Sequence, residues 1–175
     1  MDVGHRSRIL ILSGSRQAGK TTFCQRMLSQ ARQAGWQVAG VVCPARFEGG
    51  QKVGIEVVDV RSGERCLLAS QLPGECTGPT VGPWTFSTQA LEWGNGVLQR
   101  ATPCDLLVVD ELGPLEFDQG QGFTAGFEAL RSQLFRLALV VIRPECLPQA
   151  QECWPRAEVI SVEDAYKIGD HFTTR

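Results

Sequence analysis

The chain has 175 residues and 43% hydrophobic side chains, enough to form the core of one folded domain over residues 1–175. Its formal net charge of −2 gives no general basic surface, which argues against nucleic acid and favours small molecules as partners. The apolar stretch near the N-terminus, residues 9–12, is too short for a signal peptide or a membrane span, so we expect a cytoplasmic protein without a membrane partner.

The first predicted elements are a strand and a helix joined by a phosphate-binding sequence. Residues 9–12 predict a buried strand, and the next residues read Gly-Ser-Arg-Gln-Ala-Gly-Lys-Thr, with the spacing G-x-x-x-x-G-K-[ST]. Phe23, Met27 and Ala31 follow with helical spacing, and Gly35 predicts the end of the helix. We predict nucleotide contacts from Gly14, Ser15, Arg16, Gln17, Ala18, Gly19, Lys20, Thr21 and Thr22.

The residue types in this loop match the chemistry of phosphate binding. Glycines at both ends let the backbone fold around an anion, so that N–H groups point at phosphate oxygens. We expect Lys20 to reach the β- and γ-phosphates, and the Thr21 hydroxyl to ligate the Mg²⁺ ion that bridges the same oxygens. A purely structural turn has no need for a lysine followed by a hydroxyl, so the motif favours nucleotide binding.

An inserted β-hairpin is predicted after the first helix. Residues 36–43 read as a strand that Pro44 ends, and residues 47–50 connect it to two further strand-like segments, 52–60 and 64–69, around a turn at 61–63. Residues 70–83 are rich in proline and glycine. They predict a long loop, either a flap over the site or a solvated connector.

The second informative segment places two acids after a buried strand. Residues 106–109 are apolar, and Asp110 and Glu111 follow them. A buried parallel strand that ends in an acid places the carboxylate at the carboxyl edge of the sheet, where the phosphate-binding loop also lies. We expect Asp110 to hold Mg²⁺, usually through water, and Glu111 to act as general base on an attacking water.

The remaining segments complete an alternating α/β pattern. Phe123, Phe127, Leu130 and Leu134 mark a helix, and residues 137–142 and 158–161 mark two strands. The expected fold is a three-layer α/β domain with a mostly parallel central sheet, helices on both faces and the inserted hairpin. Seven cysteines lack metal-site spacing, so we expect them to serve as small apolar side chains in a reducing compartment, without a zinc site.

Four segments together resemble one family. They are the phosphate-binding loop followed by Thr22, the hairpin with Val53-Gly54-Ile55, the segment Thr80-Val81-Gly82, and residues 108–116. They are similar to the small cancer-related nucleoside-triphosphatase family, known from thermophilic microbes and animals, over nearly the whole chain. The resemblance implies a P-loop NTPase fold with an added strand between the phosphate-loop strand and the acidic strand. It also implies hydrolysis of several nucleoside triphosphates to diphosphates.

Two positions depart from the family pattern, and two arginines are candidates for a contact with the γ-phosphate. Pro83 stands where members commonly carry a polar or basic residue, and Lys52 stands where arginine is frequent. Arg46 precedes the hairpin and matches an arginine of the family. Arg143 ends the strand over 137–142, and its guanidinium would reach the γ-phosphate if that strand neighbours the phosphate-loop strand.

Three functions fit these features. The first is a Mg²⁺-dependent nucleoside-triphosphate phosphohydrolase with in-line attack by water. The second is a small-molecule kinase, for which Arg131 and Arg136 lie on a predicted helix but no lid motif is evident. The third is a nucleotide-dependent adaptor or switch; a guanine-reading N-K-x-D box is excluded because the sole asparagine is Asn95, which precedes glycine.

Overall fold

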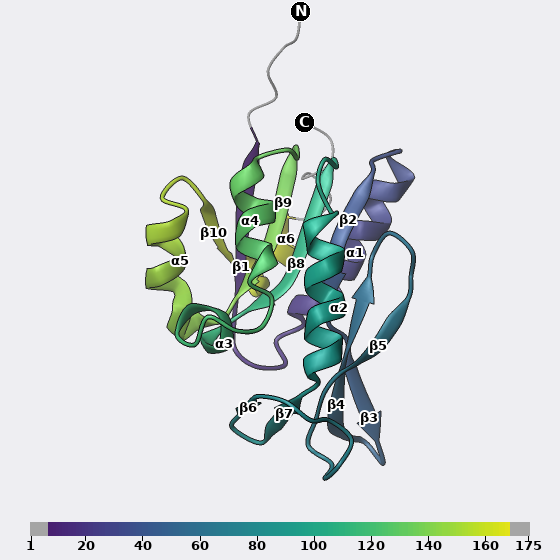
Figure 1. The fold of residues 1–175 in the computed structure, drawn as a ribbon. Helices are drawn as coiled ribbons and strands as arrows, with labels where there is room; N and C mark the ends of the chain where they lie inside the picture. Colours follow the sequence, from purple (N-terminus) through teal and green to yellow (C-terminus); the bar gives the residue numbers. More distant parts are fainter. Residues whose placement is uncertain (1–6, 169–175) are drawn as a thin grey trace, which may run out of the picture.

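The centre of the molecule is a sheet whose parallel strands are apolar on both faces, as in strands covered by helices on each side. The computed structural model describes residues 7–168. Within this range the strands form one sheet of 10 strands (Figure 1). The strands are β1 (Arg8–Ser13), β2 (Val38–Val42), β3 (Ala45–Glu48), β4 (Gln51–Asp59), β5 (Arg65–Ser70), β6 (Thr80–Val81), β7 (Trp84–Phe86), β8 (Leu106–Leu112), β9 (Leu137–Ile142) and β10 (Glu158–Ser161). Their order is β10-β1-β9-β8-β2-β4-β5-β7-β6, with β3 paired to β4.

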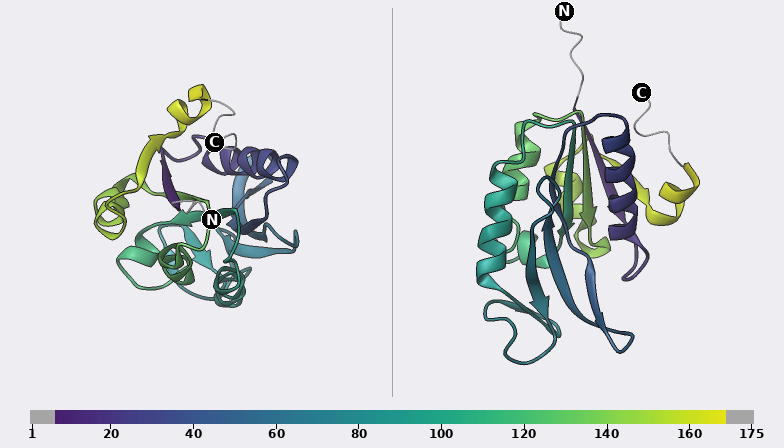
Figure 2. Two further views of the ribbon diagram at one scale, coloured as in Figure 1. Left: turned by 90° about the horizontal axis from the view of Figure 1, so that it is seen from above. Right: turned by 90° about the vertical axis from the view of Figure 1, so that its right-hand side faces the viewer.

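Alternate side chains of the parallel strands enter two separate cores. In β8, Leu106 and Val108 pack with the helix that follows the phosphate-binding loop, whereas Leu107 and Val109 pack on the opposite face. The first core is covered by α1 (Lys20–Gln33) and α6 (Val162–Ile168). The second is covered by α2 (Thr88–Gln99), α3 (Pro114–Phe117), α4 (Ala125–Ser132), the 3₁₀ turn η1 (Pro144–Cys146) and α5 (Leu147–Cys153) (Figure 2).

The predicted three-layer α/β fold is thereby confirmed. Strands β10, β1, β9, β8 and β2 are joined by parallel pairs, and strand pairing beyond β2 is antiparallel. The strands predicted around residues 9–12, 36–43, 137–142 and 158–161 are all present. Within residues 7–168, no helix has the length and apolar character needed to cross a membrane.

The inserted hairpin is confirmed, but it belongs to a larger antiparallel extension. Strands β4 and β5 pair as predicted. The segment expected to connect them to β2 is itself a strand, β3, because Gly49 and Gly50 adopt φ values of 55° and 80° and turn the chain back onto β4. The predicted loop over residues 70–83 contains β6, and β7 follows at once.

One helix was not predicted, and the bounds of another need correction. No element was assigned from the sequence to residues 84–104, which contain helix α2. A Cβ atom at Gly94 would lie 2.4 Å from the Phe123 ring. The absence of a side chain at Gly94 therefore lets this ring pack against the helix. Phe123 therefore packs on α2 and lies outside α4, and Leu134, also assigned to that helix, follows its end and is 56% exposed.

The cysteines are free thiols with different surroundings. Four of them, Cys24, Cys76, Cys104 and Cys146, are buried, in agreement with the prediction that they fill apolar space. Cys153 is exposed, which the prediction did not anticipate. The two histidines, His5 and His171, lie outside the described residues.

Candidate active site

The phosphate-binding loop and the acidic strand meet at one edge of the sheet. Strand β9 lies between β1 and β8 and is parallel to both, so the carboxyl ends of these three strands are adjacent. The loop leaves β1 and enters α1 at this edge (Figure 1). The condition set for Arg143, that its strand should neighbour the phosphate-loop strand, is therefore met.

Lys20 lies folded over the loop that precedes it. Its ammonium donates hydrogen bonds to the carbonyl oxygens of Gly14, at 2.8 Å, and Ser15, at 2.7 Å. The N–H of Phe23 donates to the carbonyl of Gly19, which starts the first turn of α1 directly after the loop. The lysine charge is thus held within the loop whose sequence predicts phosphate binding.

Thr21 and Asp110 are in direct contact. The Thr21 hydroxyl donates to Asp110 Oδ2 at 2.8 Å, and the backbone N–H of Cys43, at the end of β2, donates to the same oxygen at 3.1 Å. Burial, and after it the neighbouring Glu111, raise the pKa of Asp110 to about 6, although the two hydrogen bonds and Lys20 act in the opposite direction. The loop helix and the acidic strand are joined through this carboxylate.

The donor set at this contact fits a hard divalent cation. It consists of a hydroxyl and a carboxylate, which are the oxygen ligands that Mg²⁺ binds directly or through water. The raised pKa of the buried Asp110 carboxyl indicates that its negative charge lacks compensation there. Both observations favour a cation at this position.

Glu111 is paired with Arg143. The Nε atom of Arg143 donates to Glu111 Oε1 at 2.6 Å, and both side chains are partly buried. The register between β8 and β9 shifts between Val109 and Leu112, so the two acids lie within an irregular part of β8 and not after its end as predicted. Glu111 Oε2 has no hydrogen-bond partner within residues 7–168.

Arg46 forms its ion pairs with acids outside β8. Its guanidinium forms ion pairs with Glu75, at 2.6 Å, and with Glu48, at 3.4 Å. Glu75 Oε2 also accepts a hydrogen bond from the Ser70 hydroxyl. Arg46 thus tethers the segment after β5 to β3.

The segments that form this site lie within a region that matches a known protein family. A family model described as NTPase matches residues 9–163. The chain belongs to the NTPase family. The resemblance found in the phosphate-binding loop and the acidic segment is thereby confirmed for most of the chain.

Two relatives of this chain carry the same name. The nucleoside-triphosphatase THEP1 of Ignicoccus hospitalis is 37% identical over 107 residues, which cover 61% of this chain and 60% of the relative. The nucleoside-triphosphatase THEP1 of Methanothermobacter thermautotrophicus is 31% identical over 133 residues, which cover 75% of each. The chain therefore spans only about three fifths of the Ignicoccus protein that it matches.

Two solved structures share the fold of this chain. The solution structure of a human cancer-related nucleoside triphosphatase superposes with a TM-score of 0.68 at 23% identity, covering 92% of this chain and 95% of that one. The crystal structure of THEP1 from the hyperthermophile Aquifex aeolicus gives a TM-score of 0.63 at 17% identity, with coverage of 91% and 96%. These similarities support the P-loop NTPase fold.

No role was assigned from the sequence to three side chains near this edge of the sheet. Lys52 in β4 places its ammonium over the ring of Trp84 in β7, 5.2 Å from the ring centroid. The Tyr166 hydroxyl of α6 donates to the carbonyl of Gly19 at 3.4 Å. These contacts join segments that are far apart in the sequence, so local spacing carried no signal for them. Only the family difference at Lys52 pointed to this region.

Proposed function

We propose that this protein is a Mg²⁺-dependent nucleoside-triphosphatase that hydrolyses nucleoside triphosphates to diphosphates and phosphate. The observation that carries the proposal is the hydrogen bond between Thr21 of the loop helix and Asp110 of the acidic strand. It brings a loop of phosphate-binding sequence and an acidic pair to one site. The names of the relatives agree with this activity.

In the proposed reaction, residues 14–22 bind the phosphates through backbone N–H groups and the Lys20 ammonium. Thr21 and Asp110 would hold Mg²⁺, which neutralises charge on the phosphate oxygens when bound. Glu111 takes a proton from water through Oε2 as the water oxygen bonds to the γ-phosphorus. The bond from the γ-phosphorus to the bridging oxygen breaks, and the nucleoside diphosphate leaves with the electron pair.

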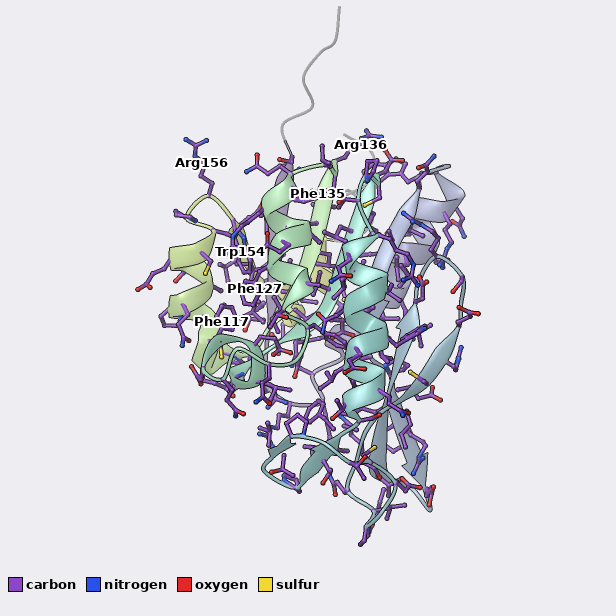
Figure 3. The ribbon with its side chains drawn as sticks, in the orientation of Figure 1. Phe117, Phe127, Phe135, Arg136, Trp154 and Arg156 are labelled. Carbon is purple, nitrogen blue, oxygen red and sulfur yellow. The ribbon has the colours of Figure 1, made fainter. Side chains whose placement is uncertain are left out.

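The kinase alternative receives no support from the arginines considered for it. Arg131 lies in α4 and pairs with Glu128 on the same helix. Arg136 lies outside any helix, over the ring of Trp36, and its carbonyl accepts the N–H of Arg8 at the start of β1. Figure 3 shows Arg136 at the end of the molecule where β1 begins, opposite the phosphate-binding loop.

The test is phosphate release from a panel of nucleoside triphosphates, with and without candidate phosphate acceptors. We expect release without an acceptor, dependence on Mg²⁺, and loss of release in Lys20→Ala, because this lysine compensates charge on the transferring group. Arg26→Ala, on the same helix but outside the motif, is the matched control. Unchanged release by folded Lys20→Ala would contradict the proposal, and loss of triphosphate only with an acceptor would favour a kinase.

A further inference from the structure

Lys52 is a half-buried cation without an acidic partner among residues 7–168. Its strand, β4, continues past the carboxyl ends of the parallel strands, so its first residues extend beyond the edge that carries the loop (Figure 1). Within residues 7–168, its ammonium has neither an ion pair nor a hydrogen bond, and its contact is the Trp84 ring. Because no carboxylate of the described residues pairs with this ammonium, an anion can approach it without displacing an ion-pair partner.

The charges that act on Lys52 come from the proposed active site. Burial lowers the pKa of Lys52, and Arg143 and Lys20 lower it further, whereas Glu111 and Asp110 raise it. These four groups lie on the acidic strand β8, at the end of β9 and at the start of α1. The Lys52 ammonium is therefore close enough to these four charged groups of the proposed site to be influenced by them.

The two arginines predicted to contact the γ-phosphate are already neutralised. Arg143 pairs with Glu111, and Arg46 pairs with Glu75 and Glu48. A triphosphate would have to compete with these carboxylates for either guanidinium. Lys52 requires no such exchange.

We propose that Lys52 is a substrate-binding residue of this site, which β4 presents and Trp84 supports, and that its ammonium contacts the γ-phosphoryl oxygens of a nucleoside triphosphate. The inference rests on the proposed function and extends it with a residue outside the phosphate-binding loop. In phosphoryl transfer, charge is spread over the equatorial oxygens of the γ-phosphoryl group, so a cation there stabilises the transition state. The Trp84 ring holds the ammonium by a cation–π contact without neutralising it.

The test compares Lys52→Met, Lys52→Arg and Arg65→Ala. The methionine variant removes the charge and keeps an apolar side chain against Trp84, and the arginine variant keeps the charge. Arg65→Ala removes a charge from β5 of the same hairpin, where Arg65 is exposed and paired with Glu56. Two quantities are measured with folded protein: kcat for phosphate release, and the ratio of affinities for a non-hydrolysable triphosphate analogue and the diphosphate.

For Lys52→Met we expect kcat to fall on the order of 10²-fold, as for loss of one transition-state donor, together with a lower triphosphate-to-diphosphate affinity ratio. Lys52→Arg should recover most of both, and Arg65→Ala should match the unmodified protein. A normal ratio and kcat in Lys52→Met, or equal losses in Arg65→Ala, would overturn the inference.

The two proposals fail in different ways. If the unmodified protein releases no phosphate, the proposed hydrolase function is wrong, but the affinity ratio still tests the contact between Lys52 and the γ-phosphate. A ratio that falls only in Lys52→Met would then support that contact. A ratio that is equal in Lys52→Met and the unmodified protein would reject it.

Discussion

Asp110 and Glu111 are neighbours in sequence with different surroundings. Asp110 is buried and accepts two hydrogen bonds, from Thr21 and Cys43, whereas Glu111 is partly exposed and pairs with Arg143. A buried carboxylate oriented by a hydroxyl suits a cation, and a carboxylate with one unpaired oxygen suits a proton acceptor. The two side chains should therefore respond differently to replacement by their amides.

Asp110→Asn should weaken Mg²⁺-dependent nucleotide binding. The amide keeps the size of the side chain but removes the negative charge beside Thr21. We therefore expect the apparent affinity for Mg²⁺ to fall about 10- to 100-fold, in the range seen when groups that orient metal ligands are lost. Binding of a non-hydrolysable triphosphate analogue is titrated at increasing Mg²⁺ concentration. Asp118→Asn, at an exposed position that bonds Gln149, is the control. Equal Mg²⁺ dependence in both variants would remove Asp110 from the metal site.

At the scale of single elements, the packing of β2 on β8 depends on one glycine. Gly40 has φ of 108°, and a Cβ atom there would lie 1.9 Å from the carbonyl oxygen of Val108. We expect Gly40→Ala to lower the free energy of unfolding by about 3 kcal/mol or more, because strain in φ adds to a clash with backbone in the core. Gly63→Ala shares a positive φ but meets open space. Urea unfolding of both variants measures the difference, and equal stabilities would show that β2 can move away from β8.

Elements with a strong local pattern could be predicted from the sequence. The phosphate-binding loop, α1, the β4–β5 hairpin and β9 each carry their signal within a few residues. Strands β3, β6 and β7 were not predicted, because they are only two to four residues long and their existence depends on pairing with a neighbouring strand. Helix α2 carries an N-cap signal, since the Ser87 side chain accepts the N–H of Ala90, but Gly94 and Gly96 weaken its helical pattern.

The sequence predicted some features of the candidate site and could not predict others. The contact of Thr21 with Asp110 agrees with the spacing of the two motifs, and their assigned roles stay predictions. The ion pairs of Arg46 and Arg143 depend on which strands lie side by side, so the sequence could name these arginines but not their carboxylate partners. The same holds for the contact of Lys52 with Trp84.

At the scale of the whole molecule, nucleotide binding should stabilise the fold. The proposed site joins β1, α1 and β8, which include much of both cores, so a ligand there binds the folded chain and not the unfolded one. A non-hydrolysable triphosphate analogue with Mg²⁺ at 100 times its Kd should add about 2.7 kcal/mol to the free energy of unfolding. Thermal unfolding at several ligand concentrations measures this effect. Full stabilisation in excess chelator, or in Lys20→Ala, would contradict the proposed site.

The measurement that tests the central claim most directly is single-turnover phosphate release by Glu111→Gln at saturating nucleotide. The amide preserves the shape of the side chain but cannot take a proton, so nucleotide affinity should be retained while release slows by a factor on the order of 10²–10⁴. Glu128→Gln, at an exposed position of α4, should release phosphate at the unmodified rate. Release by Glu111→Gln at the unmodified rate would contradict the account, since water would then be activated by another group.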